Sequence, residues 1–445
     1  MAEVADAFNA AVSLTSSSAN SGGINSLQDI QAVQSHLSAG ILFSDPRLRI
    51  PIPILEALTL DMRFDKPSAI QASTIPLILD GRNVIAQAQA GSGKTIAFTI
   101  GMLSAVDTSR DELQAICLTP TRELANQILS DAVANLAKRM PAIRYEAAIP
   151  GIDVEKFSRC RSHIVVGTPG KVKNWLTTKY LDFATVRMFV LDEADAMVAK
   201  SQTAKTMGAD TIAIKKTLPP TAQILFFSAT YTQDIIAFSE RIISKAHLVT
   251  LSSDEDLILE VVFQVCMNVG SSADAKLQVL QEMYETLKIK QSIVFAEMRR
   301  DVDRIADMMN RNGFPVSKLH GELTPGERDA AMREFREGNS KVLITTNVLA
   351  RGVDVPSVAV VVNYDLPTER MGNTGRVAGD CATYVHRIGR CSRFGRKGMV
   401  VNFLQSRQDM EVMSQIELYY SPKKRMTCDW NPADIEGLRD EFEKR

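Results

Sequence analysis

The sequence lacks any close pair of cysteines. No two of its six cysteines form a CxxC pair; they are Cys117, Cys160, Cys266, Cys381, Cys391 and Cys428. Cysteines scattered in this way exclude the usual spacing of a structural zinc site and argue against a disulfide framework. We therefore expect the protein to work in a reducing compartment.

Long apolar runs and net charge are also missing. No uninterrupted apolar run is long enough to span a membrane. The N-terminus carries Glu3 and Asp6 but no basic residue before its apolar positions, so we expect no secretory signal. The 51 Lys and Arg residues balance 52 Asp and Glu residues, so nucleic acid could be bound only through a local basic surface. These features predict a protein of the cytoplasm or nucleus without membrane attachment.

The chain instead contains short apolar runs that alternate with longer helical patterns, and its 445 residues favour two domains. Residues 1–42 form an N-terminal extension, partly disordered around SLTSSSANSGG, with a possible short amphipathic helix in SLQDIQAVQSHL. Over residues 43–250, the runs NVIAQA, AICLTP, HIVVGTP, RMFVLDEA and QILFFSAT predict strands separated by crossover helices.

A polar acidic stretch at 251–258 reads as a linker, and a second series of strands follows over residues 259–445. Its runs are SIVFAE, KLHG, KVLITTN, VAVVVNYD and GMVVNFL. The predicted fold class is therefore α/β, with two tandem domains that each contain a parallel sheet covered by helices on both faces.

A phosphate-binding loop is indicated by AQAGSGKT at residues 88–95, which follows a predicted strand and precedes a predicted helix. Glycines 91 and 93 would turn backbone N–H groups toward phosphate oxygens. Lys94 would reach the β- and γ-phosphates, and Thr95 would bind Mg²⁺. The full set of loop residues comprises Ala90, Gly91, Ser92, Gly93, Lys94 and Thr95. The alternative is a plain glycine-rich turn, and Ala88 stands where such loops usually begin with glycine.

Three carboxylates end the apolar run FVLDEADAM at residues 189–197. In an open parallel sheet the ligand lies beyond the carboxyl ends of the strands, so these groups should lie at the same edge as the phosphate loop. Asp192 would hold hydrated Mg²⁺, and Glu193 would orient and deprotonate the attacking water. Asp195 would bond to neighbouring structure. The alternative is an exposed acidic loop, although three carboxylates left uncompensated so close together would repel one another.

With GSGKT, DEAD and SAT (228–230) in this order, the chain resembles the DEAD-box ATP-dependent RNA helicases. The resemblance extends through PTRELA (120–125), TPGK (168–171), TTNVLARGVD (345–354) and HRIGRCSRFGR (386–396), and covers residue 43 to the C-terminus. Within that family the chain looks most like the mRNA-export branch, because of FVLDEADAMVA, Asn347, FREG at 335–338 and an insertion at 368–383.

The resemblance implies two RecA-like domains that close over ATP and RNA. It places Phe64 on the face of the adenine and Gln71 at its edge, where an amide supplies both a donor and an acceptor. Stacking on Phe64 could add ~1–3 kcal/mol. The alternative for Phe64 is an ordinary core phenylalanine. Gly352 and Asp354 would contact the ribose side of the nucleotide.

The same resemblance makes Arg390 and Arg393 arginine fingers for the γ-phosphate, and His386 a link to the DEAD segment. The alternative for the arginines is a solvated basic face. Asp195, Ser228 and Thr230 would couple the two domains. Ser392 stands where many relatives have glycine.

The RNA contacts that the resemblance implies are Arg122, Gly151, Thr168, Gly170, Gly321, Arg328 and Thr346. They combine backbone amides, hydroxyls and arginines, which suit phosphates and 2′-hydroxyls and predict little sequence preference for a single strand or short duplex. Pro150 and Pro325 depart from the residues that the family usually has beside these positions.

The resulting hypothesis is an RNA-stimulated ATP hydrolase that separates short strands or remodels RNA–protein complexes. Two alternatives stay open: a nucleotide-gated RNA clamp with little turnover, and a phosphate-loop ATPase acting on DNA or protein. The mRNA-export branch implies a nucleoporin and an activator that uses inositol hexakisphosphate as partners at the cytoplasmic face of the nuclear pore. We expect the protein itself to be a monomer.

Overall fold

The structure is a computed structural model that describes residues 31–32, 41–87, 92–155, 158–198, 206–230, 233–250, 262–272, 274–287, 289–347, 358–371, 376–391, 398–421 and 425–444. The chain divides into two compact units, Met1–Ser253 and Asp254–Arg445, here called unit 1 and unit 2. Among the described residues, no helix combines the length and the apolar character that crossing a membrane requires.

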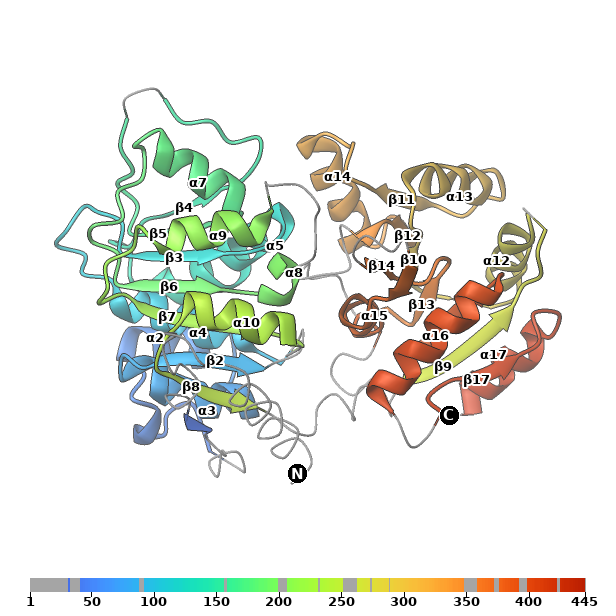
Figure 1. Ribbon diagram of the computed structural model, residues 1–445, viewed down its shortest axis with the longest axis horizontal. Helices are drawn as coiled ribbons and strands as arrows, with labels where there is room; N and C mark the ends of the chain where they lie inside the picture. Colours follow the sequence, from blue (N-terminus) through green and yellow to red (C-terminus); the bar gives the residue numbers. More distant parts are fainter. Residues whose placement is uncertain are drawn as a thin grey trace, which may run out of the picture. The chain divides into compact units, whose positions relative to one another are not determined.

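Unit 1 contains a parallel sheet of eight strands (Figure 1). Across the sheet these are β1 (Gln31–Ala32), β8 (Ala246–Thr250), β2 (Asn83–Gln87), β7 (Gln223–Ser228), β6 (Met188–Leu191), β3 (Ala115–Leu118), β5 (Ile164–Gly167) and β4 (Tyr145–Ala148). Parallel neighbours need crossover connections, which the intervening helices supply.

Helices cover both faces of this sheet. They are η2 (Pro46–Leu48), α2 (Ile52–Glu56), η3 (Ala57–Asp61), α3 (Ala69–Leu79), α4 (Lys94–Ala105), α5 (Arg122–Gln127), η4 (Ile128–Val133), α6 (Ala134–Leu136), η5 (Ala137–Arg139), α7 (Pro169–Thr177), α8 (Ala194–Val198), α9 (Met207–Lys215) and α10 (Gln233–Ile242). Strand β3 shows why both faces are apolar: Ala115 and Cys117 pack into one core, and Ile116 and Leu118 pack into the other. The period of two in a strand sends successive side chains to opposite faces.

Unit 2 repeats this plan with seven parallel strands. Across the sheet these are β11 (Val316–Leu319), β12 (Val342–Thr345), β10 (Ser292–Phe295), β13 (Val360–Asn363), β16 (Gly398–Leu404), β9 (Val262–Asn268) and β17 (Cys428–Trp430). Its helices are α12 (Ala275–Thr286), α13 (Arg299–Arg311), α14 (Pro325–Arg336), α15 (Cys381–Ile388), α16 (Arg407–Tyr420) and α17 (Ile435–Lys444). Two buried apolar clusters again lie on the two faces of the sheet.

The insertion at 368–383 is an antiparallel ribbon of β14 (Thr368–Met371) and β15 (Arg376–Gly379), followed directly by the start of α15. Gly379 lies against α16, where a Cβ atom would come within 2.8 Å of the Cγ1 atom of Ile416. Its N–H donates to Oε1 of Gln415 over 3.0 Å. A side chain at this position would push the ribbon off the helix.

The predicted α/β class with two parallel sheets is confirmed, and the apolar runs named from the sequence contain strands, except that KLHG includes only the last two residues of β11. The helix predicted in SLQDIQAVQSHL is wrong at the two positions that are described, because Gln31 and Ala32 pair with β8 as a strand. The rest of that segment, the predicted disorder and the linker at 251–258 lie outside the described residues.

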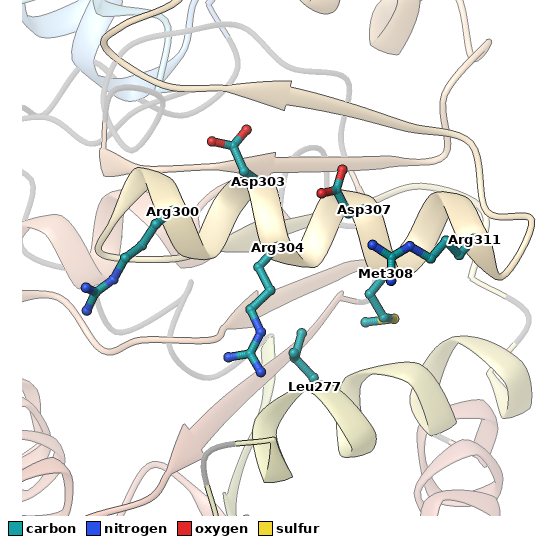
Figure 2. A pocket seen from close by; sticks show the side chains of 7 residues that line it. All are labelled: Leu277, Arg300, Asp303, Arg304, Asp307, Met308 and Arg311. Carbon is teal, nitrogen blue, oxygen red and sulfur yellow. The ribbon is translucent and has the colours of Figure 1, made fainter.

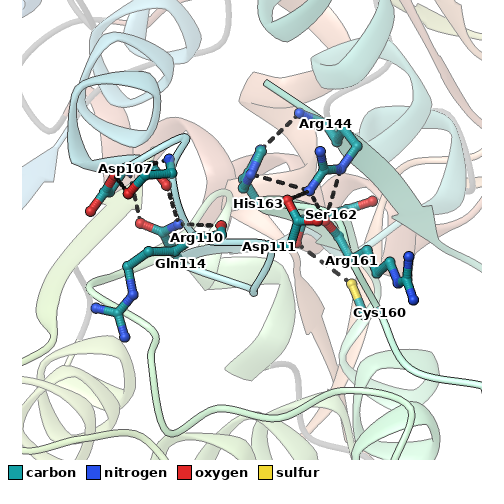
Figure 3. Close-up of polar contacts among 10 residues, drawn as sticks. Asp107, Arg110, Asp111, Gln114, Arg144, Cys160, Arg161, Ser162 and His163 are labelled. Carbon is teal, nitrogen blue, oxygen red and sulfur yellow. Dashed lines mark hydrogen bonds and ion pairs between the residues drawn. The ribbon is translucent and has the colours of Figure 1, made fainter. Parts of the chain in front are cut away.

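A buried histidine joins three loops of unit 1 (Figure 3). The Nδ1 atom of His163 accepts the backbone N–H of Arg144 over 2.9 Å, and the guanidinium of Arg144 bonds to Asp111 and to the carbonyl of Arg161. The side chain of Gln114 closes the neighbouring loop. Its Oε1 atom accepts the N–H of Asp107 and its Nε2 atom donates to the carbonyl of Asp107, both over 2.8 Å. Burial, reinforced by the charge on Arg144 and opposed by Asp111, lowers the pKa of His163 below 6.5.

This histidine should make unit 1 less stable in mild acid. Unfolded His163 takes up a proton near pH 6.5, whereas folded His163 resists it, so the stability it contributes is complete above pH 6.5 and falls below it. The slope for one group cannot exceed about 1.4 kcal/mol per pH unit. Urea unfolding at pH 7.5 and 5.5 would measure the loss, and His163→Asn, which keeps an acceptor for Arg144 N–H, should reduce it. An equal loss in this variant would contradict the assignment.

Candidate functional site

The strand order of unit 1 brings the phosphate loop and the acidic segment together. Strands β2, β7 and β6 are successive neighbours, and Lys94, Ser228 and Asp192 follow or end these strands at the same carboxyl edge. The position is the one at which open α/β sheets bind ligands. The structure therefore brings Lys94, Ser228 and Asp192 to one edge of the sheet.

Lys94 lies buried between two of these carboxylates. Its Nζ atom is 3.0 Å from Oδ1 of Asp192 and 3.9 Å from Oε1 of Glu193, and the three side chains are at most 5% exposed. Oδ2 of Asp192 and Oε2 of Glu193 have no hydrogen-bond partner among the described residues. Buried unpaired oxygens of this kind are costly, so the cluster is built to receive further positive charge or hydrogen-bond donors.

The charges in this cluster are strongly coupled. Burial alone lowers the pKa of Lys94, but Asp192, Glu193 and Asp195 outweigh it, and the net pKa of Lys94 is raised. Burial raises the pKa of Asp192 more than Lys94 lowers it, with a further rise from Glu193. Lys94 is therefore firmly protonated, and it holds Asp192 through a buried ion pair.

The backbone of Glu193 is strained. Its φ of 51° lies in the left-handed region, which costs a non-glycine residue on the order of 1 kcal/mol. Two hydrogen bonds hold the turn: Asp192 N–H donates to the carbonyl of Leu118, and Glu193 N–H donates to Oδ1 of Asp192, each over 3.0 Å. Strain of this kind gathers at functional sites, where surrounding structure fixes a side chain in one direction.

Gln71 contacts the phosphate loop directly. With Ser68 it forms a capping box at the start of α3, and its Nε2 atom donates to the carbonyl of Gly93 over 3.0 Å. Gly93 has a φ of 93°, and a Cβ atom there would lie 2.5 Å from Nε2 of Gln71. Phe64 is 43% exposed, so its ring is not an ordinary core phenylalanine. Neither observation tests the predicted adenine contacts.

The predicted RNA contacts of unit 1 follow the other strands of the same edge. Arg122 starts α5 after β3, Thr168 and Gly170 follow β5, and Gly151 follows β4. The N–H of Thr168 donates to the carbonyl of Ala148 over 3.0 Å and so joins the last two of these loops. The nucleotide and RNA candidates thus occupy adjacent halves of one sheet edge.

In unit 2 the structure brings Gly321, Arg328 and Thr346 to the ends of β11 and β12. The guanidinium of Arg328 donates to the carbonyl of Gly321 over 2.6 Å, and Thr346 N–H donates to the carbonyl of Leu319 over 3.3 Å. Pro325 is the first residue of α14, where a missing N–H costs nothing. The departure at Pro325 therefore leaves the start of this helix intact.

Helix α15 carries His386, which is 2% exposed, and Arg390 follows the helix end and is 1% exposed. Nε of Arg390 donates to the carbonyl of His386 over 3.2 Å. Arg387, to which the sequence assigns no role, is fully buried and donates hydrogen bonds to Asn347 and Asn363. Its place directly after His386 in the sequence indicated a role in this segment. The sequence could not indicate its hydrogen-bond partners, which lie up to 40 residues away along the chain.

Several predicted site residues lie outside the described residues. They are Ala90, Gly91, Gly352, Asp354 and Arg393. Ser92, Gly93 and Thr95 are described at the start of α4, Asp195 lies on α8, and Ser228 donates its hydroxyl to the carbonyl of Thr230 over 2.6 Å. The roles of all these residues stay predictions.

A hollow of about 610 Å³ lies along α13 of unit 2 (Figure 2). Side chains of both signs line it: Arg300, Arg304 and Arg311 alternate with Asp303 and Asp307. Asp303 already bonds to Lys318 over 2.6 Å. This surface is a solvated helix face with compensated charges, and none of the predicted site residues lines it.

Comparison with known proteins agrees with this geometry. Residues 68–238 match the model of the DEAD/DEAH box helicases, and residues 275–395 match that of the helicase conserved C-terminal domain. The chain belongs to the DEAD-box family of ATP-dependent RNA helicases, with two tandem RecA-like domains.

The relatives narrow the family further. The chain is 40% identical to the ATP-dependent RNA helicase DBP5 of Mycosarcoma maydis over 358 residues, which cover 80% of this chain and 75% of that protein. The structure of Saccharomyces cerevisiae Dbp5 bound to RNA and ADP BeF3 matches with a TM-score of 0.80 and 36% identity over 90% of this chain and 98% of that one. A variant of the same yeast protein bound to Nup159, a Gle1 variant, IP6 and ADP matches with a TM-score of 0.60 and 35% identity, over 89% of this chain and all of that one.

Proposed function

We propose that this RNA helicase acts in mRNA export, as a monomer at the cytoplasmic face of the nuclear pore and elsewhere in the cytoplasm and nucleus. The likeness to DBP5 over most of both chains supports this proposal. The yeast relative was solved with Nup159, Gle1 and IP6, so a nucleoporin and an activator that uses inositol hexakisphosphate are the partners to test.

In unit 1, the residues around Lys94 would hold the triphosphate. Lys94 would exchange part of its contact with Asp192 for the β- and γ-phosphates, whose charge is greater. The free Oδ2 of Asp192 and the adjacent Thr95 fit Mg²⁺, which prefers one or two protein oxygens together with phosphates. The metal would neutralise charge that develops on the phosphates. Glu193, fixed by its backbone turn, would orient and deprotonate the attacking water.

Phe64 and Gln71 would select adenine. The Gln71 carbonyl accepts Ser68 N–H, and its amide nitrogen donates one hydrogen to Gly93, each within 3.0 Å. An amide has two donor hydrogens and two acceptor lone pairs, so one of each stays available for the adenine edge. Gln71 can therefore contact the base without releasing the phosphate loop.

The single observation that carries the coupling of ATP to RNA is the order of strands in unit 1. Nucleotide candidates follow β2, β7 and β6, and RNA candidates follow the adjoining β3, β5 and β4. Contacts at Arg122, Gly151, Thr168 and Gly170 would grip the RNA backbone without reading its sequence. In unit 2, Gly321, Arg328 and Thr346 would do the same.

Hydrolysis would need residues of both units. Asp195, Ser228 and Thr230 in unit 1, with His386 in unit 2, would signal that RNA and ATP are bound. Gly352 and Asp354 would contact the ribose, and Arg390 and Arg393 would neutralise the γ-phosphate. ATP and RNA would then each raise the affinity for the other, as linkage requires.

The export proposal is tested by binding. We expect the purified chain to bind a Nup159-type nucleoporin and to gain ATPase activity from a Gle1-type activator only when inositol hexakisphosphate is present. An unrelated nucleoporin is the control for the first measurement, and inositol without phosphates is the control for the second. Absence of both effects, with RNA-stimulated ATPase intact, would remove the export role and leave a general RNA helicase.

A further inference from the structure

Arg387 is a buried cation that neutral groups hold in place. Its Nε and Nη2 atoms donate to Oδ1 of Asn347 over 3.1 and 2.5 Å. Its Nη1 atom donates to Oδ1 of Asn363 over 2.8 Å and to the carbonyl of Asp365 over 2.7 Å. The guanidinium carbon lies 4.8 Å from the ring centroid of Phe295. Among the described residues, every hydrogen-bond acceptor of this side chain is an amide or carbonyl oxygen.

A buried guanidinium normally has a carboxylate partner, because burying an unpaired charge is expensive. The nearest acidic candidate, Asp365, uses its carboxylate for Lys276 Nζ and for the N–H of Glu297, over 2.6 and 2.9 Å. Burial lowers the pKa of Arg387 to about 10, although Asp365 opposes this effect. Hydrogen bonds to the two asparagines therefore matter more here than they would beside a carboxylate.

Arg387 is also part of a polar chain that anchors α15 to the sheet. The amide of Asn363 donates to Oδ1 of Asn402 over 2.8 Å, and Asn402 donates to the hydroxyl of Tyr384 over 3.1 Å. The hydroxyl of Tyr384 in turn donates to Oε1 of Gln264 over 2.9 Å. These hydrogen bonds run from β13 through β16 to α15 and on to β9. Arg387 is therefore attached to a rigid part of unit 2.

Asn347, which accepts the hydrogen bonds of Arg387, is exposed and lies next to the residues proposed to contact RNA. Asn347 directly follows Thr346, and the two lie beyond β12, while Arg387 lies between His386 and Arg390 along the chain. One carbonyl oxygen of Asn347 accepts two N–H groups of a planar guanidinium. A displacement of Thr346 therefore either breaks both bonds or moves α15 with it.

We propose that Asn347 and Arg387 are a positioning pair, through which RNA bound at the ends of β11 and β12 sets the orientation of α15, and with it Arg390, for ATP hydrolysis. The inference rests on the proposed roles of Thr346 and Arg390. It adds a route within unit 2 by which RNA bound at Thr346 affects the position of Arg390. The pair touches neither RNA nor ATP in this account.

The test is the variant Asn347→Ala. Asn347 is exposed, and Arg387 keeps its hydrogen bond to Asn363 in this variant. We expect the ratio of RNA-stimulated to basal kcat to fall about tenfold, within the 5–150-fold range usual for coupling between sites. The Kd for a single-stranded RNA and the KM for ATP should change little, whereas the Tm should fall by a few degrees because two N–H groups of a buried guanidinium lose their acceptor. Asn310→Ala on α13 removes an exposed asparagine whose side chain has no hydrogen bond among the described residues, and should leave all four quantities unchanged.

Asn347→Asp is the conservative variant. It keeps the accepting oxygen and gives Arg387 a carboxylate, so stimulation should be retained and the Tm should rise by about 2–4 °C. The result that overturns the pair is an Asn347→Ala protein with wild-type stimulation. A loss of stimulation matched by an equal loss of RNA affinity also overturns it, because Asn347 would then be an RNA contact. A wild-type protein without RNA stimulation would instead refute the proposed function itself.

Discussion

Replacing Arg390 with alanine is expected to lower the RNA-stimulated rate of ATP hydrolysis by about 10³–10⁵-fold, the contribution of an arginine finger to phosphoryl transfer. The physical reason is the negative charge that builds up on the γ-phosphoryl oxygens in the transition state, which a guanidinium neutralises better than water does. Affinities for ATP and RNA should change much less, because this charge is fully developed only during the reaction. Single-turnover hydrolysis with saturating RNA measures the effect.

Burial of Arg390 makes a stability control necessary. The side chain is 1% exposed and bonds to the carbonyl of His386, so its removal leaves a small cavity as well as removing a charge. Thermal unfolding should therefore accompany the kinetics. Arg311→Ala removes an exposed arginine from α13 and should leave the rate unchanged. A rate for Arg390→Ala within a few-fold of wild type would show that Arg390 is structural.

Glu193→Gln should lower RNA-stimulated turnover by about 10²–10⁴-fold, the usual contribution of a general base. Glutamine has nearly the same shape but cannot take a proton from water. It also removes one of the carboxylates around Lys94, whose Nζ lies 3.9 Å from Glu193, so ATP affinity should be retained. The variant should stay on RNA longer than wild type when ATP is present, because the step that releases it is slowed. Malachite-green phosphate release and RNA dissociation by fluorescence measure the two effects.

The same experiment separates the competing readings of the sequence. A nucleotide-gated clamp would show little ATPase in the wild type and no further loss in Glu193→Gln. An ATPase acting on DNA or protein would show turnover that RNA does not stimulate. Glu282→Gln makes the same chemical change at an exposed position on α12 and should have no effect.

Much of the fold could be predicted because its signals are local. Continuous apolar runs such as FVL before DEAD predict buried strands, and the strands that were missed have a reason in their composition. Strand β4 reads YEAA and β17 reads CDW, so neither is an apolar run. Strand β9 contains Gln264, whose buried amide is satisfied by Tyr384, 120 residues away. No local sequence pattern predicts that Tyr384 is the hydrogen-bond partner of Gln264.

The sequence alone determined the phosphate loop, the acidic segment and the family, since these depend on contiguous residues and on their order along the chain. Only the tertiary structure decided that Lys94 is buried against Asp192, that Gln71 bonds to Gly93, and that Arg387, among the residues that the structure describes, is held by two asparagines and no carboxylate. The reason is that lateral pairing of parallel strands joins segments far apart in the chain. The partners of a buried charge depend on which strand ends that pairing brings together.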